Sequence, residues 1–181
     1  FARHRYPQAK ALIDIGGEDA KVVFFNGKSM ELRMNGNCAG GTGAFIDQMA
    51  VLTGSTNSEL NDKAMVAKQL YPMAARCGVF AKTDIQNLMS RNLPESDIAA
   101  SIFHSIAVQT ITTLSHGCDF TPPILLCGGP LTFLPALRKA FAEYLKMNDD
   151  DFIVLREGNL IPSIGCALRA DKAEAVDIDT L

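Results

Sequence analysis

Cys38 and Cys77 carry the most distinctive chemistry in the sequence, because each thiol stands close to glycine near the expected start of a helix. Cys38 precedes the turn Gly40-Gly41-Thr42-Gly43, and Cys77 is followed directly by Gly78. The positive end of a helix dipole stabilises a thiolate. It would equally favour a cubane iron–sulfur cluster, which is an anion when four thiolates hold it. Two cysteines are too few for one cluster, so two copies of the chain would have to share it across a two-fold axis. Free cysteine is also a common core residue, and buried, idle thiols are the alternative interpretation.

Glycine clusters stand at three places where the chain is expected to turn: Asp14-Ile15-Gly16-Gly17-Glu18-Asp19, Gly40-Gly41-Thr42-Gly43 and Gly128-Gly129. Glycine lets the backbone approach a ligand closely, and free N–H groups at a hairpin or a helix start can bind an anion. Carboxylates beside such a turn can hold Mg²⁺ through water. Ordinary turns also use glycine, and the sequence has neither a P-loop nor a dinucleotide fingerprint. The spacing by itself therefore indicates no more than a possible nucleotide site.

The remaining polar candidates favour structural roles. Cys127 and Cys166 are expected in the core, because the first lies in an apolar run and the second among small helical residues. Asp149-Asp150-Asp151 is interpreted as a solvated loop rather than a magnesium site.

The elements that must position these residues follow from periodicity and turn signals. Strands are expected at 11–15, 21–25, 29–34, 124–126 and 152–155, with a tight turn at Asn26-Gly27. Helices are expected between Thr42 and Gly54, at 58–70 with Ser58 as its cap, and at 83–92, 95–117, 133–147 and 162–170. Hairpin-linked strands followed by helices and then by alternating strands and helices predict an α/β fold. This order suits a ribonuclease H-like lobe, a mixed sheet covered by helices.

Composition narrows the class of protein. The chain has 181 residues, 48% of them apolar and 20% charged, and a formal net charge of −3. Without a block of Lys and Arg, nucleic acid is not an expected partner. No run approaches the roughly 18 apolar residues that span a bilayer, so no membrane association is expected. Five cysteines, an odd number, without a secretory signal favour a reducing, cytoplasmic location. The chain begins at Phe1 rather than at Met, so we interpret it as a piece of a longer protein.

Taken together, the motifs resemble one ATPase family. The segment from Asp14 to Lys21 resembles a second phosphate-binding hairpin, and Leu126-Cys127-Gly128-Gly129-Pro130 resembles an adenosine-binding turn. The segments from Met34 to Phe45 and from Cys77 to Thr83 are similar to two cysteine motifs. The family is that of the BadF/BadG/BcrA/BcrD type, the activators of (R)-2-hydroxyacyl-CoA dehydratases and the ATPase subunits of benzoyl-CoA reductases. It lies within the acetate and sugar kinase, heat-shock 70 and actin superfamily.

The resemblance implies a set of roles. Residues 1–170 would be the C-terminal, second lobe of an actin-like ATPase domain truncated at its N-terminus, and 171–181 a tail or linker. ATP or ADP would bind with Mg²⁺. Cys38 and Cys77 would hold a 4Fe–4S cluster shared across a homodimer of the parent protein. Asp14 and Glu18 would be catalytic, and the nucleotide would be bound by Gly16, Gly17, Asp19, Gly40, Gly41, Thr42, Gly43, Gly128 and Gly129.

The implied activity is ATP-dependent transfer of a low-potential electron from an external donor, through the cluster, to a dehydratase or reductase component. Two departures weaken the match: Glu18 stands where the family usually has Gln, and Lys82 where it usually has an acidic residue. The first phosphate hairpin of the family is also absent from the chain. A non-catalytic nucleotide-binding or interaction lobe of a large multidomain protein is therefore an alternative. A lobe of a small-molecule kinase is another, and it would not need the two cysteines.

Overall fold

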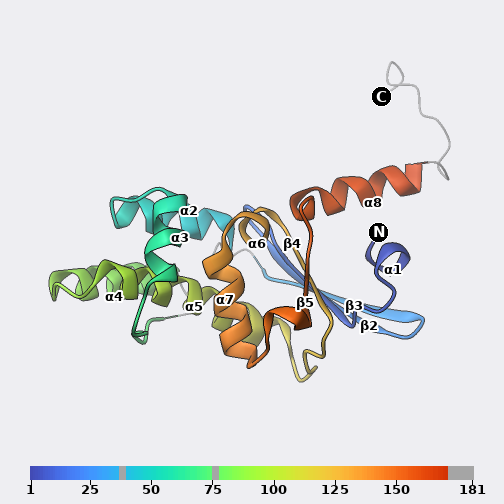
Figure 1. The fold of residues 1–181 in the computed structure, drawn as a ribbon, viewed down its shortest axis with the longest axis horizontal. Coiled ribbons are helices and arrows are strands. Elements are labelled where there is room, and N and C mark those ends of the chain that lie inside the picture. Colours follow the sequence, from blue (N-terminus) through green and yellow to red (C-terminus); the bar gives the residue numbers. More distant parts are fainter. Residues whose placement is uncertain (37–39, 75–77, 171–181) are drawn as a thin grey trace, which may run out of the picture.

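The fold is a five-stranded mixed sheet with helices on both faces, seen in a computed structural model that describes residues 1–36, 40–74 and 78–170 (Figure 1). The strand order is β3-β2-β1-β4-β5. β1 pairs antiparallel with β2 and parallel with β4, while β2–β3 is antiparallel and β4–β5 parallel. The expected mixed sheet covered by helices is confirmed.

The strands lie where alternation and apolar runs predict them. Their bounds are Ala11–Ile15 (β1), Ala20–Asn26 (β2), Ser29–Met34 (β3), Ile124–Cys127 (β4) and Phe152–Val154 (β5). Every residue of β1 and β4 is buried, as expected of central strands with both faces covered. The tight turn is present, but it is formed by Gly27 and Lys28, one residue further along than expected. Asn26 pairs with Ser29 across it, and Gly27 takes a φ of 58°.

The helices are α1 (Ala2–Arg5), α2 (Gly43–Leu52), α3 (Asn57–Met65), α4 (Gly78–Ser90), α5 (Glu95–Leu114), α6 (Gly129–Phe133), α7 (Pro135–Leu145) and α8 (Ile161–Ala170). Two 3-10 turns, η1 (Asp149–Asp151) and η2 (Gly158–Leu160), complete the order. In the part of the chain that is described, no helix combines the length and apolar character needed to cross a membrane.

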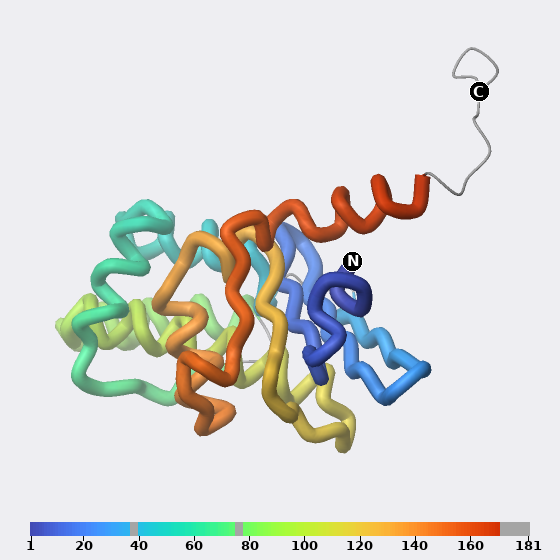
Figure 2. The backbone as a smooth tube through the Cα atoms, turned by 45° about the vertical axis from the view of Figure 1, so that its right-hand side comes forward, coloured from blue at the N-terminus to red at the C-terminus, as the bar shows by residue number. Residues whose placement is uncertain are grey.

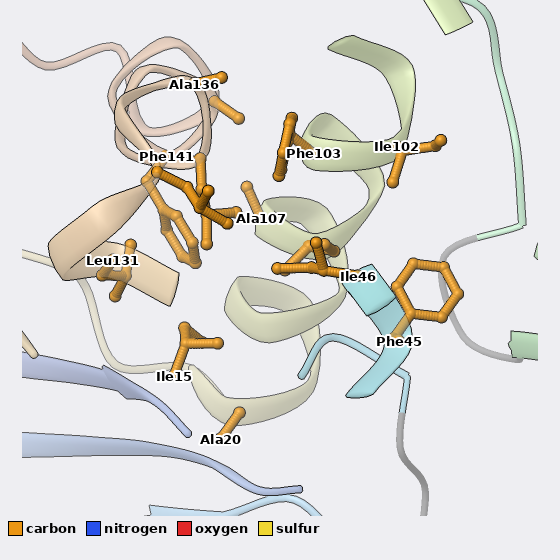
Figure 3. Packing of buried hydrophobic residues seen from close by; sticks show 14 of the residues in the cluster. Ile15, Ala20, Phe45, Ile46, Ile102, Phe103, Ala107, Leu131, Ala136 and Phe141 are labelled. Carbon is orange, nitrogen blue, oxygen red and sulfur yellow. The ribbon is translucent and has the colours of Figure 1, made fainter. Parts of the chain in front are cut away.

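The larger core lies between one face of the sheet and the helices α2 to α7. Ile13 and Ile15 of β1 meet Phe103 of α5 and Phe141 of α7, all of them fully buried. Figure 3 shows Phe103 between α5 and α7, Phe141 pointing from α7 toward the strands, and Ile46 of α2 nearby. Twelve residues of α5 are buried, which shows that this helix lies at the centre of the core. It therefore supports both the sheet and the other helices.

The other face of the sheet carries a smaller core. Leu12, Leu125 and Cys127 pack there with Ala2 of α1 and Ile161 of α8. Ile161 is the buried residue of α8, and Figures 1 and 2 show the rest of that helix running away from the sheet. The expected burial of Cys127 is confirmed, whereas that of Cys166 is wrong: it is exposed, because this part of α8 has no layer above it.

Several expected helix boundaries are wrong, and the helix expected to run to 117 ends at Leu114. The helix placed at 58–70 is α3, and its cap is Thr56, whose side chain and that of Glu59 form a reciprocal capping box. It ends at Met65, and further along the chain the N–H groups of Lys68 and Tyr71 donate to the side chains of Asp97 and Ser101, both on α5.

The helix expected at 83–92 is α4 and begins five residues earlier, at Gly78. The helix expected at 133–147 is two helices, since α6 begins at Gly129 and the chain breaks at Leu134 before Pro135 starts α7. The residue before a proline is disfavoured in helical geometry, which explains the break. The short α1 was not expected. Asp149–Asp151, expected as a solvated loop, forms a 3-10 turn in which Asp149 and Asp150 are exposed. The expected tail at 171–181 lies outside the described residues.

Candidate functional site

The turn between β1 and β2 is a closed loop with a carboxylate folded over it. The N–H of Gly16 donates to the carbonyl of Asp19 over 2.8 Å. A Cβ at Gly16 would lie 2.5 Å from Oδ1 of Asp19, so a larger residue cannot stand there without displacing that carboxylate. Asn35, just after β3, holds the start of β2, because its side-chain oxygen accepts from the N–H of Ala20 over 2.8 Å. The hairpin is thus fixed in shape by its own residues and by its neighbour strand.

The second glycine turn docks directly on this hairpin. The first two N–H groups of α2, those of Gly43 and Ala44, donate to the carbonyls of Gly16 and Gly17 over 2.9 and 2.6 Å. A Cβ at Gly43 would lie 3.2 Å from both Gly16 O and Gly17 Cα, so glycine permits this close approach. We expected these N–H groups to be free for an anion. They are already used within the chain, so an anion at this helix start would need other donors.

The third turn closes against the end of β1. Gly128 has a φ of 87° and a ψ of 158°, a conformation open essentially to glycine alone. A Cβ there would lie 2.6 Å from Oδ1 of Asp14 and would overlap the carbonyl oxygen of Ile15. The N–H of Gly128 donates to the carbonyl of Gly158 over 3.1 Å, which ties η2 to the same turn. Gly158 itself is buried against Thr132 and was not predicted, since no motif marks it.

The three turns, predicted separately, therefore meet at one place. β1 and β4 are parallel neighbours, and both end at this edge of the sheet. A Cβ at Gly43 would lie 3.4 Å from the ring of Pro130 as well as against the hairpin, so all three turns touch. Open α/β sheets bind ligands at the carboxyl ends of their parallel strands. No local pattern predicts how far apart the turns lie. The pairing of β1 with β4 and the docking of α2 on the hairpin bring them together.

Charged side chains line the same edge. Asp14 stands opposite Lys21 on β2 and opposite Cys127 on β4, so all three project from one face. Burial raises the pKa of Asp14; Lys21 opposes this rise and Asp19 adds to it. Lys21 is 2.5 Å from Oδ2 of Asp19. Burial, reinforced by Asp14, also raises the pKa of Cys127, so this thiol remains protonated.

A nearby cation would offset the cost of burying the charged form of the Asp14 carboxyl group. Asp14 is 9% exposed, whereas Glu18 at the tip of the hairpin is exposed. Among residues 1–36, 40–74 and 78–170, no three His, Cys, Asp or Glu side chains gather closely enough to hold a metal ion. Magnesium in nucleotide sites is commonly held by one or two carboxylates together with phosphate and water.

The cysteines predicted to hold a cluster, Cys38 and Cys77, lie outside the described residues. The helices that follow them, α2 and α4, are in contact near their starts: a Cβ at Gly78 would lie 3.5 Å from the ring of Phe45. Figure 3 shows Phe45 at the edge of the core beside Ile46. The two motifs, far apart in the sequence, are thus followed by helices that begin close together.

Polar residues of α5 hold the backbone of the second glycine turn and of the segment after α3. These residues were not predicted. The side-chain amide of Gln109 donates to the carbonyl of Gly40 over 3.0 Å. Asp97 and Ser101, further up the same helix, accept hydrogen bonds from the segment that leads toward Cys77. Their spacing of four residues within an apolar helix was the available signal, because residues four apart share one face.

Comparison with known proteins decides the family. Residues 2–170 match the profile described as the BadF/BadG/BcrA/BcrD ATPase family. The chain belongs to this family. Among its curated relatives, the 2-hydroxyisocaproyl-CoA dehydratase activator of Clostridioides difficile is 34% identical over 125 residues, which are 68% of this chain and 47% of the relative. The (R)-2-hydroxyglutaryl-CoA dehydratase activating ATPase of Acidaminococcus fermentans is 31% identical over 125 residues, 68% of this chain and 48% of the relative. The chain thus spans about half the length of these members of the family.

Solved structures of the BadF/BadG/BcrA/BcrD family share the fold. Component A of the A. fermentans (R)-2-hydroxyglutaryl-CoA dehydratase superposes with a TM-score of 0.84 at 28% identity, covering 94% of this chain and 64% of that one. The C. difficile activator of 2-hydroxyisocaproyl-CoA dehydratase, solved with ADPNP bound, gives 0.81 at 26% identity, covering 97% and 68%. The predicted family and the actin-like ATPase fold are both confirmed.

Proposed function

We propose that this chain is the second lobe of an ATP-dependent activator that passes a low-potential electron to a 2-hydroxyacyl-CoA dehydratase or benzoyl-CoA reductase-type partner. The observation that carries the proposal is the meeting of the three glycine turns at the ends of β1 and β4, beside the start of α2. Phosphate would bind at the hairpin of Gly16 and Gly17, and the adenosine moiety near Gly128 and Gly129. Family membership, and the ADPNP bound by the C. difficile activator, support this assignment.

In this proposal Asp14 and Glu18 act on the metal and the phosphate. Asp14 would accept Mg²⁺, directly or through water, and the cation would offset the cost of burying its charge. The exposed Glu18 would face the terminal phosphate from the tip of the hairpin. Asp19 is already engaged by Lys21 and over Gly16, so it would shape the loop in addition to contacting nucleotide.

The redox part of the proposal assigns Cys38 and Cys77 of two copies to one 4Fe–4S cluster, which carries one electron at a time at low potential. The contact between α2 and α4 supports it, because both cysteines directly precede this pair of helices in the sequence. Two thiolates from each chain provide the four ligands of a cubane. An external donor would reduce the cluster, and the partner enzyme would accept the electron.

The hydrogen bonds between the hairpin and α2 offer a route for coupling. Nucleotide can drive a change only if it binds two arrangements of the protein with different affinity. A shift of the Gly16–Gly17 backbone would act on Gly43 and Ala44, whose N–H groups donate to it. That movement would reach the turn immediately after Cys38.

Iron and acid-labile sulfide analysis of protein prepared without oxygen tests the redox assignment. Wild type should bind about two iron atoms per chain, because one four-iron cluster serves two chains. Cys38→Ser and Cys77→Ser should each lose the iron and the brown colour. Cys166→Ser is the matched control, since this exposed thiol should be dispensable. Full iron content in both ligand variants would refute the assignment.

A second function deserves a test because of Glu18. Its carboxylate adds negative charge where the triphosphate would lie, which disfavours hydrolysis unless a metal compensates. In that case the chain would be a non-catalytic nucleotide-binding lobe. Calorimetric binding of Mg²⁺–ADP together with phosphate release from Mg²⁺–ATP separates the two functions. If the chain binds Mg²⁺–ADP but releases no phosphate from Mg²⁺–ATP, and Glu18→Gln restores phosphate release, the non-catalytic function would be favoured.

A further inference from the structure

β3 forms one edge of the sheet and carries a row of exposed apolar side chains. Met30, Leu32 and Met34 are 63%, 60% and 56% exposed. They alternate along the strand, so they project from one face of the sheet. It is the face of the smaller core, because Leu32 stands opposite Val23 and Met30 opposite Phe25. Figure 2 shows the β2–β3 hairpin, in light blue, at the margin of the fold, where another chain can approach it.

The backbone of β3 is arranged to accept another strand. The N–H of Asn35, just after β3, donates to the carbonyl of Ala20 over 3.0 Å, so Asn35 bonds toward β2. Backbone groups alternate in direction along an antiparallel strand, and those of Met30, Leu32 and Met34 therefore point away from β2. Such an edge is a template for another strand unless lysine, proline or a bulge protects it. β3 contains neither lysine nor proline, and its register with β2 has no bulge.

The sequence of β3 is complementary to itself in the antiparallel direction. With a two-fold axis through Leu32, Met30 of one copy faces Met34 of the partner subunit, and Leu32 faces the partner's Leu32. These are the residues whose backbone groups point outward, so each pair can exchange both of its hydrogen bonds. Glu31 then faces the partner's Arg33. Opposite charges directly across two strands stabilise their pairing, whereas like charges oppose it.

Arg33 is held in position by the end of α5. Its guanidinium donates to the carbonyl of Leu114 over 3.1 Å and also to that of Ser115. It pairs with Glu31 of its own strand over 2.6 Å. The side chain of Arg33 is 15% exposed, whereas that of Glu31 is 51% exposed. A second copy across the edge would place another arginine beside this exposed carboxylate.

We propose that β3 is a self-association edge, to which a second copy of this chain adds its own β3 in antiparallel register about a two-fold axis at Leu32. The axis closes the assembly at two copies, because each copy uses the same edge. The interface needs neither a cluster nor a nucleotide, so it goes beyond the proposed function. An edge strand of 6 residues is smaller than a standard interface of about 800 Å² per partner, and we therefore expect association in the micromolar range.

Sedimentation equilibrium of the metal-free chain tests the association, because no cluster can then join two copies. Wild type should change from monomer to dimer as its concentration rises through the micromolar range. Leu32→Lys should raise the dissociation constant by at least about tenfold, since two ammonium groups would face each other on the axis. Val66→Lys is the matched control, because Val66 is 69% exposed and lies outside β3. A wild type that stays monomeric up to about 1 mM, or equal dissociation constants for wild type and Leu32→Lys, would overturn the proposal.

Disulfide crosslinking tests the register. In Leu32→Cys the two introduced thiols would stand directly opposite, at a Cα separation of about 5.5 Å, which a disulfide can bridge. In Met30→Cys they would be offset by four residues, about 13 Å along the strands, which is beyond the roughly 7 Å limit. After mild oxidation, peptide mapping by mass spectrometry should find the bridge between introduced thiols in Leu32→Cys alone. Bridges in both variants, or in neither, would show that the register is wrong.

The inference and the proposed function can fail separately. If the metal-free chain stays monomeric while the iron-loaded chain dimerises, the shared cluster would stand and the β3 edge would not. If the metal-free chain dimerises through β3 and the chain binds no iron, the reverse holds. Urea unfolding checks that each variant is folded. Glu31→Lys, which would put like charges opposite each other at the partner's Arg33, replaces Leu32→Lys if the latter does not fold.

Discussion

Gly128→Ala is expected to destabilise the chain strongly, and its neighbour provides the control. Gly128 takes a φ of 87° at the end of β4, where a Cβ would lie 2.6 Å from both the carbonyl carbon of Ile15 and Oδ1 of Asp14. It would also overlap the carbonyl oxygen of Ile15. Backbone cannot yield as a flexible side chain can, so β1 and β4 would have to separate at this end. The substitution therefore tests whether the two strands meet as described.

The cost has two parts of similar size. Holding alanine in a glycine-only conformation costs about 1–3 kcal/mol. Forcing a methyl group into a filled space costs about 1–3 kcal/mol more. The sum, about 2–6 kcal/mol, is a large share of the roughly 5–15 kcal/mol by which a domain is stable. At roughly 2–4 °C per kcal/mol for a domain of this size, the midpoint of thermal unfolding should fall by at least about 4 °C.

Gly129→Ala changes the next residue by the same methyl group into open space. A Cβ at Gly129 meets no atom within 4 Å, and the residue is the first of α6. Alanine favours a helix over glycine by up to about 1 kcal/mol, so this variant should be neutral or slightly more stable. Thermal unfolding followed by circular dichroism measures both. Equal midpoints for the two variants would show that the described approach of Gly128 to β1 is wrong.

Four further substitutions should alter stability in ways that urea unfolding can measure. Asn61→Ala removes the acceptor of the N–H of Ala136 at the start of α7, a buried bond of 2.9 Å, and should cost about 1–3 kcal/mol; an unchanged midpoint would contradict that bond. Thr56→Ala should cost about 1 kcal/mol through loss of the capping box. The hydrogen bonds of Thr56 lower the pKa of Glu59, so the advantage of wild type over Glu59→Gln should be full above 4.5 and fade as the pH falls below it; a pH-independent difference would argue against the box. Burial raises the pKa of Asp14, so its charge should cost increasingly more as the pH rises above 3.8, and Asp14→Asn should stabilise the chain at neutral pH while weakening binding of Mg²⁺–ADP; a less stable Asn variant would refute this.

Local patterns were sufficient for the strands and for the long helix. β1 and β3 have the expected bounds, and α5 begins at the expected residue, because their apolar periodicity and flanking turns are encoded within a few residues. The family was also readable, since its glycine and cysteine motifs are contiguous segments. One boundary that failed depends on distant residues, because the backbone after α3 is held by Asp97 and Ser101 of α5. The break at Leu134 is local, since the residue before Pro135 is disfavoured in a helix.

The sequence by itself determined which residues could serve a nucleotide and an anionic cluster, because glycine, carboxylate and thiol chemistry is a property of residue type. It did not determine that the first N–H groups of α2 are used by the hairpin, or that the Asp14 carboxyl is pressed against Gly128. The first fact arises only when α2 docks on the hairpin. The second arises only when the parallel pairing of β1 and β4 brings residues more than a hundred positions apart into contact. Likewise, Cys127 and Cys166 stand in similarly apolar surroundings in sequence, and only the packing of the sheet buries one and leaves the other exposed. Burial and spacing across the fold are set by all the layers together, so no local pattern can contain them.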